Sequence, residues 1–143
     1  MTSAPGAFAV SFPGRSPRPL CMATVSCGGA SREVLALWDT GATNTCISRE
    51  VAEGLGLTEV GTVDVPTPTG AAVLPRYRVG LAFDGGIAFG GVVATGSETG
   101  RPGLGVLVGM DVISRGDFAT SCLGGQTRFT FRVPSSEHAD FTA

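Results

Sequence analysis

Short apolar runs alternate with turns rich in glycine along most of the chain, and few of them are long enough for a helix. Several runs alternate apolar and small or polar residues with a period of two, as in Tyr77–Phe83, which is typical of a half-buried strand. We therefore expect a chain built mostly from strands. The expected strands cover 20–27, 33–38, 43–47, two segments within 60–83, 87–94, 104–108, 118–123 and 127–133.

Two short helices are expected among these strands. Ser48 is a suitable N-cap residue, and Val51, Ala52 and Leu55 follow it at helical spacing before the glycines at 54 and 56. A second short helical pattern covers 110–115. A mostly β chain with one or two short helices and many tight turns predicts a small closed barrel.

The ends of the chain have a different composition. Residues 1–19 contain four prolines and two glycines, which predicts a flexible N-terminal arm. Residues 135–143 are polar and predict a C-terminal tail. One folded domain over 20–134 is the expectation, and a length of 143 residues agrees with a single domain.

Residue counts exclude several classes of chemistry. The chain has no lysine, which excludes a P-loop lysine and a Schiff base. The one histidine, His138, lies near the C-terminus, so histidine-dependent catalytic pairs and a metal site are not expected. A net charge of −2 argues against a nucleic-acid partner, and the absence of long apolar runs argues against a membrane span. No cofactor is expected.

Cysteine use and the N-terminal sequence bear on location. Four cysteines at 21, 27, 46 and 122 form no C-x-x-C pair, and the first residues do not resemble a signal peptide. We therefore expect free, mostly buried thiols in the cytoplasm, although the spacing also allows a Cys21–Cys27 disulfide.

Asp39 is the carboxylate that the pattern singles out. It follows the apolar run of the strand at 33–38 and precedes Thr40-Gly41-Ala42, so a charge emerges from a buried strand into a tight turn. A carboxylate in such a place needs backbone N–H donors or a partner that shares its charge. A turn carboxylate in an ordinary barrel is the simpler alternative.

The segment Ala36-Leu37-Trp38-Asp39-Thr40-Gly41-Ala42 resembles the catalytic loop of retropepsin-like aspartic proteases. Val106–Ile113 is similar to the second signature of that family, in which apolar residues precede a glycine and a short helix. The segments 116–119 and 127–133 resemble the bacterial branch, and the whole resemblance spans about residues 20–134.

The resemblance implies a homodimeric aspartic endopeptidase acting on protein or peptide substrates. Two carboxyl groups must share one proton to activate water, and this chain offers one D-T-G motif, so the second Asp39 would come from a second copy. The family pattern makes Asp39, Thr40 and Gly41 the catalytic set. It also assigns substrate contacts to the residues after this motif and to the tip of a flap hairpin, namely Ala42, Thr43, Asn44, Thr67, Pro68, Thr69 and Gly70.

Three positions depart from the family pattern. Thr43 and Met110 stand where retroviral enzymes carry an Asp and an Arg that pair near the dimer interface, so other contacts must hold this dimer. Ala42 stands where some relatives have Ser, which removes a hydrogen bond to the carboxylates and favours a mildly acidic optimum.

Other interpretations remain open for the protein and for its residues. An inactive retropepsin-like dimer that binds peptides or a partner is the alternative function, and a monomeric β-barrel carrier is a third class. Asp111 and Asp117 are interpreted as helix-start and turn residues, and Cys46 as a packing residue. Arg76 and Arg78 are most simply solubilising charges, or else groups that meet an acidic substrate.

Overall fold

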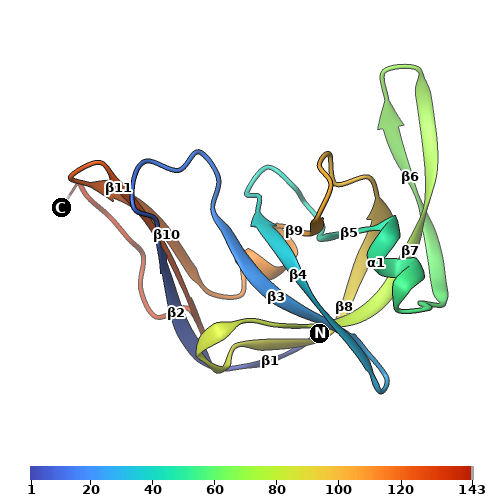
Figure 1. Cartoon of the computed structure of the whole chain (residues 1–143), viewed down its shortest axis with the longest axis horizontal. Coiled ribbons are helices and arrows are strands. Elements are labelled where there is room, and N and C mark those ends of the chain that lie inside the picture. The colour runs from blue at the N-terminus through green and yellow to red at the C-terminus, as the bar shows by residue number, and fades with distance from the viewer. Residues whose placement is uncertain (143) are drawn as a thin grey trace.

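The computed structural model describes residues 1–142, which fold mainly as β-strands (Figure 1). Two short α-helices and one 3-10 turn, η1, interrupt the strands. The elements are β1 (Thr2–Ala4), β2 (Gly6–Ser11), β3 (Leu20–Cys27), β4 (Ala30–Trp38), β5 (Cys46–Ser48), α1 (Arg49–Gly54), β6 (Glu59–Thr67), β7 (Gly70–Ala82), η1 (Asp84–Gly86), β8 (Ala88–Ser97), β9 (Leu104–Val108), α2 (Met110–Ile113), β10 (Asp117–Leu123) and β11 (Gln126–Val133).

Six strands close into a barrel in the order β8-β5-β9-β4-β3-β7, because β7 also pairs with β8. Most neighbours are antiparallel, but β4 pairs with β9, and β5 with β8, in parallel. The expected small closed barrel with two short helices is therefore confirmed. Ser48 caps α1 as expected, since its hydroxyl oxygen accepts a hydrogen bond of 3.2 Å from the backbone N–H of Val51.

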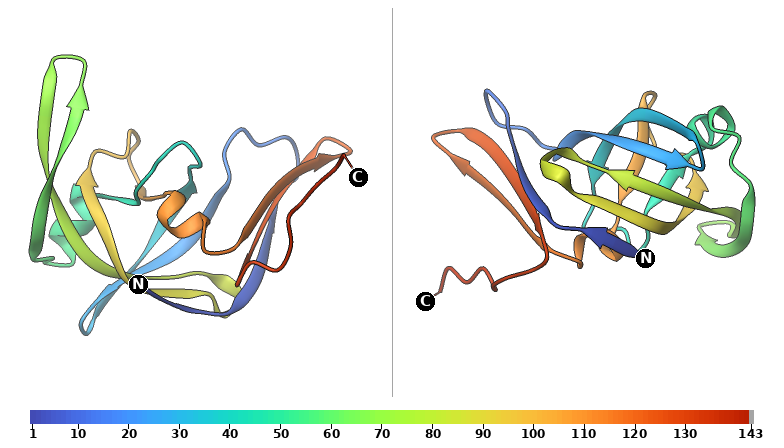
Figure 2. Two further views of the ribbon diagram at one scale, coloured as in Figure 1. Left: turned by 180° about the vertical axis from the view of Figure 1, so that it is seen from behind. Right: turned by 90° about the horizontal axis from the view of Figure 1, so that it is seen from below.

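Two further units flank the barrel. The strands β2, β11 and β10 form a three-stranded sheet on one side, and the β6–β7 hairpin projects on the other (Figure 2). The interior between the barrel and the small sheet is aromatic. Trp38 lies within 6 Å of Phe8, Phe83, Phe118 and Phe131, measured between ring centroids, and its ring stacks on Phe118 at 7°.

The N-terminal segment differs from the expected flexible arm. It contains β1, which pairs with β8, and β2, which pairs with β11 through the register Phe8 to Phe131. Phe8 is only 9% exposed and belongs to the core. The prolines at 5 and 13 flank β2 rather than interrupt it, so the alternation of Phe8, Val10 and Phe12 with smaller residues is that of a real strand.

The C-terminal tail has no regular structure from Pro134 to Thr142, and its last residue, Ala143, lies outside the described residues. The beginning of the tail is nevertheless fixed to the small sheet. The Asp117 carboxylate accepts hydrogen bonds from the Ser135 hydroxyl and the Ser136 backbone N–H, and it pairs with Arg132 at 2.7 Å.

All four cysteines are free thiols, but Cys27 and Cys122 are exposed, which corrects the expectation that most would be buried. Both lie close to hairpin turns, where polar and apolar side chains alike contact solvent. Between residues 1 and 142, no helix has the length and apolar character needed to cross a membrane.

Candidate active site

Strand β4 carries Asp39 to the surface. Ala36 and Trp38 in this strand are buried in the core, at 0% and 2% exposure, while Asp39 directly after it is half-buried. The backbone N–H of Asp39 donates to the Val108 carbonyl at 2.9 Å, which continues the β4–β9 ladder by one residue. The carboxylate therefore stands at the end of a rigid strand.

The chain reverses immediately after Asp39 in the segment we call the Asp39 loop, residues 39–45. The Gly41 backbone N–H donates to Oδ1 of Asp39 at 2.9 Å, and the Ala42 N–H donates to the Asp39 carbonyl at 3.1 Å. A Cβ atom on Gly41 would lie 3.2 Å from the same carboxylate oxygen, so glycine allows the close approach of this N–H donor.

The Asp39 loop is joined to the segment after β9. The Met110 N–H donates to the Ala42 carbonyl at 2.8 Å, and the Asp111 N–H donates to the Thr43 carbonyl at 3.2 Å. Gly109 packs so closely that a Cβ atom there would lie 2.6 Å from the carbonyl carbon of Asn44. The two sequence signatures, far apart along the chain, thus form one hydrogen-bonded unit.

Thr45 is a residue of this unit that the sequence did not identify. Its side chain is 1% exposed, donates to the Asp111 carboxylate at 2.8 Å and accepts from the Gly109 N–H at 3.2 Å. Asp111 also accepts from the Val112 N–H at 3.0 Å, so it is a helix-start residue as interpreted, with an additional partner. A single threonine in a polar stretch gives no signal for such a long-range contact.

The remaining residues expected near the site fall into two groups. Thr40, Thr43 and Asn44 are exposed in the Asp39 loop, next to the carboxylate. The other group, Thr67, Pro68, Thr69 and Gly70, forms the exposed tip of the β6–β7 hairpin. The hairpin and the Asp39 loop rise on the same side of the barrel, but the tip stands apart from the loop (Figures 1 and 2).

The thiol of Cys46 lies close to the Asp39 loop and is half-buried. Burial raises the pKa of this thiol above its ordinary value, and the nearby carboxylates of Asp111 and Asp39 raise it further. A thiol with a raised pKa is a weak nucleophile at neutral pH. The carboxylate of Asp39 is therefore the better candidate for chemistry.

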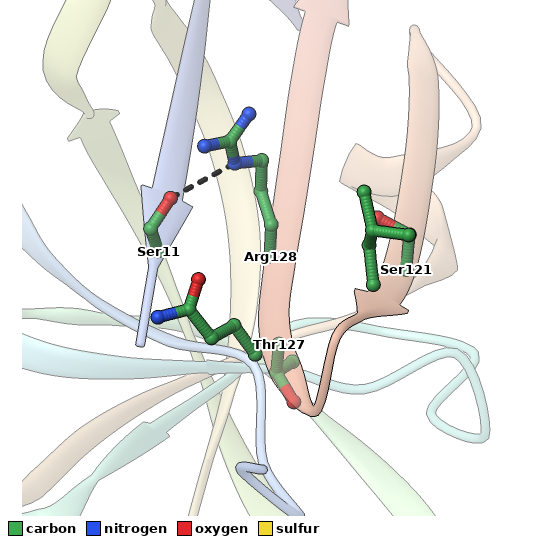
Figure 3. Close-up of a pocket in the computed structure, with 6 residues that line it drawn as sticks. Ser11, Ser121, Thr127 and Arg128 are labelled. Carbon is green, nitrogen blue, oxygen red and sulfur yellow. Dashed lines mark hydrogen bonds between the residues drawn. The ribbon is translucent and has the colours of Figure 1, made fainter. Parts of the chain in front are cut away.

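A separate hollow of about 180 Å³ lies on the three-stranded sheet (Figure 3). Its lining includes Ser11, Ser121, Thr127 and Arg128, and Nε of Arg128 donates to the Ser11 hydroxyl oxygen at 2.9 Å. No carboxylate or thiol lines it, so it offers no acid–base pair. Residues 1–142 also contain no cluster of three His, Cys, Asp or Glu side chains that could hold a metal ion.

Comparisons with known proteins bear on the fold and on the family. No curated protein matches the chain. A retropepsin-like aspartic protease from Rickettsia conorii has a similar structure, with a TM-score of 0.58 and 14% identity over 91% of this chain and 96% of that one. A Legionella pneumophila protein of unknown function is less similar, with a TM-score of 0.41 and 16% identity over 65% and 83% of the two chains.

The fold is thus similar to that of a retropepsin-like protease. The family model described as aspartyl protease matches residues 23–112, which is more than half of the chain and includes both the Asp39 loop and the Gly109 segment. The chain belongs to the aspartyl protease family.

Proposed function

We propose that the protein is a homodimeric aspartic endopeptidase whose active site contains two Asp39 carboxyl groups, one from each subunit. The observation that carries the proposal is the Asp39 carboxylate, which is half-buried at the end of β4 and held by the Gly41 N–H at 2.9 Å. Family membership supports hydrolysis by an acid protease. One chain supplies one such carboxylate, so a two-carboxylate mechanism requires a second copy.

In the proposed mechanism, one Asp39 is ionised and the other is protonated. The ionised group takes a proton from a water molecule as the water oxygen attacks the peptide carbonyl carbon. The protonated group donates a hydrogen bond, and then its proton, to the carbonyl oxygen. The tetrahedral intermediate breaks down when the Asp39 that took the water proton passes it to the amide nitrogen and the C–N bond cleaves, while the other Asp39 recovers its proton from a hydroxyl of the intermediate.

The surface beside the Asp39 loop suits a second copy. Thr40 is exposed, Met110 is 37% exposed, and both line a hollow of about 450 Å³ with Ile113 and Phe118. A twofold axis near Asp39 would cover this surface with the partner's copy of it. In this arrangement Thr40 would bind the partner's loop, while Ala42, Thr43 and Asn44 would contact substrate.

The β6–β7 hairpin is proposed as the flap. Its tip, Thr67 to Gly70, would close over an extended peptide on the side from which the Asp39 loop rises. An extended substrate would be bound through backbone hydrogen bonds, with alternate side chains directed to opposite faces.

The proposal is tested by the Asp39→Asn variant. The wild-type protein should cleave denatured protein substrates at mildly acidic pH. The activity of the variant should be lower by about 10²–10⁴-fold, as expected for the loss of an acid–base group. Far-ultraviolet circular dichroism and thermal unfolding serve as folding controls. Equal cleavage by both proteins would exclude the Asp39 mechanism.

A further inference from the structure

Five residues on adjacent strands form one continuous row across the barrel. Leu37 of β4 pairs with Leu107 of β9, Leu107 with Cys46 of β5, Cys46 with Thr95 of β8, and Thr95 with Arg76 of β7. Side chains of directly paired residues point to the same face of a sheet. The row therefore begins two residues before Asp39 and ends at the base of the β6–β7 hairpin.

The row lies on the face opposite the hydrophobic core, although Thr95 within it is only 6% exposed. The residues next to it along their strands are core residues: Trp38, Val108, Ile47 and Ala94 are all 2% exposed or less. Since side chains alternate between faces along a strand, the row occupies the opposite face. Alternation from Leu37 places the Asp39 carboxylate on this face as well, because the Asp39 N–H continues the ladder.

The β6–β7 hairpin continues this outer face of the sheet beyond Arg76. Val63 pairs with Leu74, and Val65 pairs with Ala72. All four residues are half-buried and lie on the same face of the hairpin as Arg76. On the opposite face of the hairpin, Val73 is 66% exposed. Arg76 thus stands at the corner where the less exposed face of the hairpin meets the row that leads to Asp39.

The guanidinium of Arg76 lacks partners at this corner. Its Nε atom is buried and has no hydrogen-bond partner within residues 1–142, and no carboxylate of that range forms an ion pair with it. Arg32 and Arg132, by contrast, pair with carboxylates at 2.9 and 2.7 Å. Because no carboxylate of residues 1–142 neutralises this guanidinium, its charge remains available to an acceptor from another molecule.

We propose that Arg76 is a specificity-determining residue that selects a Glu or Asp side chain of the peptide substrate; this inference rests on the proposed protease function. A guanidinium binds a carboxylate through two parallel, charge-assisted hydrogen bonds. Leu37 and Arg76 lie four strands apart along the curved row, so at about 4.8 Å per strand their separation is at most roughly the length of five to six residues of extended peptide. The acidic residue is therefore expected within about six residues of the scissile bond.

The test compares cleavage sites of the wild-type dimer and three variants in a library of peptides from a digested bacterial lysate, identified by mass spectrometry. Arg76→Gln removes the charge at the corner. Arg78→Gln is the matched control, because Arg78 has the same parity on β7 but is exposed and lies two residues farther from the hairpin tip. Arg76→Glu reverses the charge. Synthetic peptides that differ only by Glu or Gln at the enriched position then give the ratio of kcat/KM.

We expect the wild-type protein and Arg78→Gln to prefer Glu over Gln by about tenfold, as one charge-assisted interaction allows. Arg76→Gln should lose this ratio, and Arg76→Glu should shift the preference to Lys or Arg, which a merely structural role would not produce. Cleavage without acidic preference, or a preference that survives in Arg76→Gln, overturns the inference and leaves the protease function standing. Absence of any cleavage that depends on Asp39 overturns both.

Discussion

The hydroxyl of Thr45 donates a 2.8 Å hydrogen bond to the carboxylate of Asp111, which joins the Asp39 loop to α2. The same hydroxyl oxygen accepts from the Gly109 N–H at 3.2 Å, so one buried atom connects both sequence signatures. Replacing it would leave a backbone N–H and a carboxylate without this partner. The connection explains how residues far apart in the sequence hold one loop in place.

Thr45→Val should therefore destabilise the protein by about 1–3 kcal/mol, the usual range when a buried hydrogen-bonding group loses its partner. Thr45→Ser keeps the hydroxyl and serves as the control. Urea unfolding followed by tryptophan fluorescence measures both, since Trp38 directly precedes the Asp39 loop. A free energy of unfolding for Thr45→Val within about 0.5 kcal/mol of the wild-type value would contradict a structural role for this hydroxyl.

Gly109→Ala tests the close packing of α2 on the Asp39 loop. A Cβ atom there would lie 2.6 Å from the carbonyl carbon of Asn44 and 2.9 Å from the Thr45 nitrogen, and these are backbone atoms that cannot move independently. We expect the loop to shift and proteolytic activity to fall by about 10²-fold, the cost of a 1 Å misplacement.

Gly29→Ala is the matched control for that change, because Gly29 lies in the β3–β4 turn and a Cβ atom there meets nothing within 4 Å. Its activity and melting temperature should match those of the wild-type protein. Wild-type activity in Gly109→Ala would show that the loop tolerates displacement.

Local sequence signals predicted the parts of the fold that depend on local physics. The Ser48 cap, the turn at the hairpin tip and the apolar run that leads to Asp39 each depend on a few neighbouring residues. The closed barrel followed from many short strands and turns, which leave few other ways to bury the apolar faces.

Long-range pairings were beyond these signals. Apolar residues alternate around Phe8, but the flanking prolines indicate a loop. The strand forms because β11, more than 100 residues later, pairs with it. Likewise, the row from Leu37 to Arg76 depends on the register of five strands, which one sequence does not specify. From the sequence alone, Arg76 is therefore either a solubilising charge or a group that meets an acidic substrate.

Asp117 should make stability depend on acidic pH. Hydrogen bonds from Ser135 and Ser136, together with Arg132, hold the pKa of this carboxyl well below its ordinary value of 3.8. A carboxyl whose pKa is lower in the folded than in the unfolded state stabilises the protein fully above the unfolded value. That contribution decreases as the pH falls below about 4 towards the lower pKa of the folded state.

Melting temperatures between pH 2 and pH 7 measure this effect. The wild-type protein should lose stability on acidification more steeply than Asp117→Asn, which has no titrating group at this position. Asp140→Asn is a second carboxyl variant for comparison, since Asp140 accepts hydrogen bonds from Thr142, two residues away in the tail. Identical acid profiles for Asp117→Asn and the wild-type protein would show that the tail anchor contributes nothing to stability.

Shared catalysis makes a quantitative prediction for mixed subunits. If each active site needs one Asp39 from each chain, a 1:1 mixture of wild-type and Asp39→Asn subunits at fixed total concentration contains roughly one quarter wild-type dimers after random exchange. Activity should then fall to about a quarter of that of the pure wild-type protein, rather than to half. Mixing after unfolding and joint refolding ensures exchange, and light scattering reports the dimer. Activity of one half would mean that each subunit acts alone, and the two-carboxylate proposal would have to be abandoned.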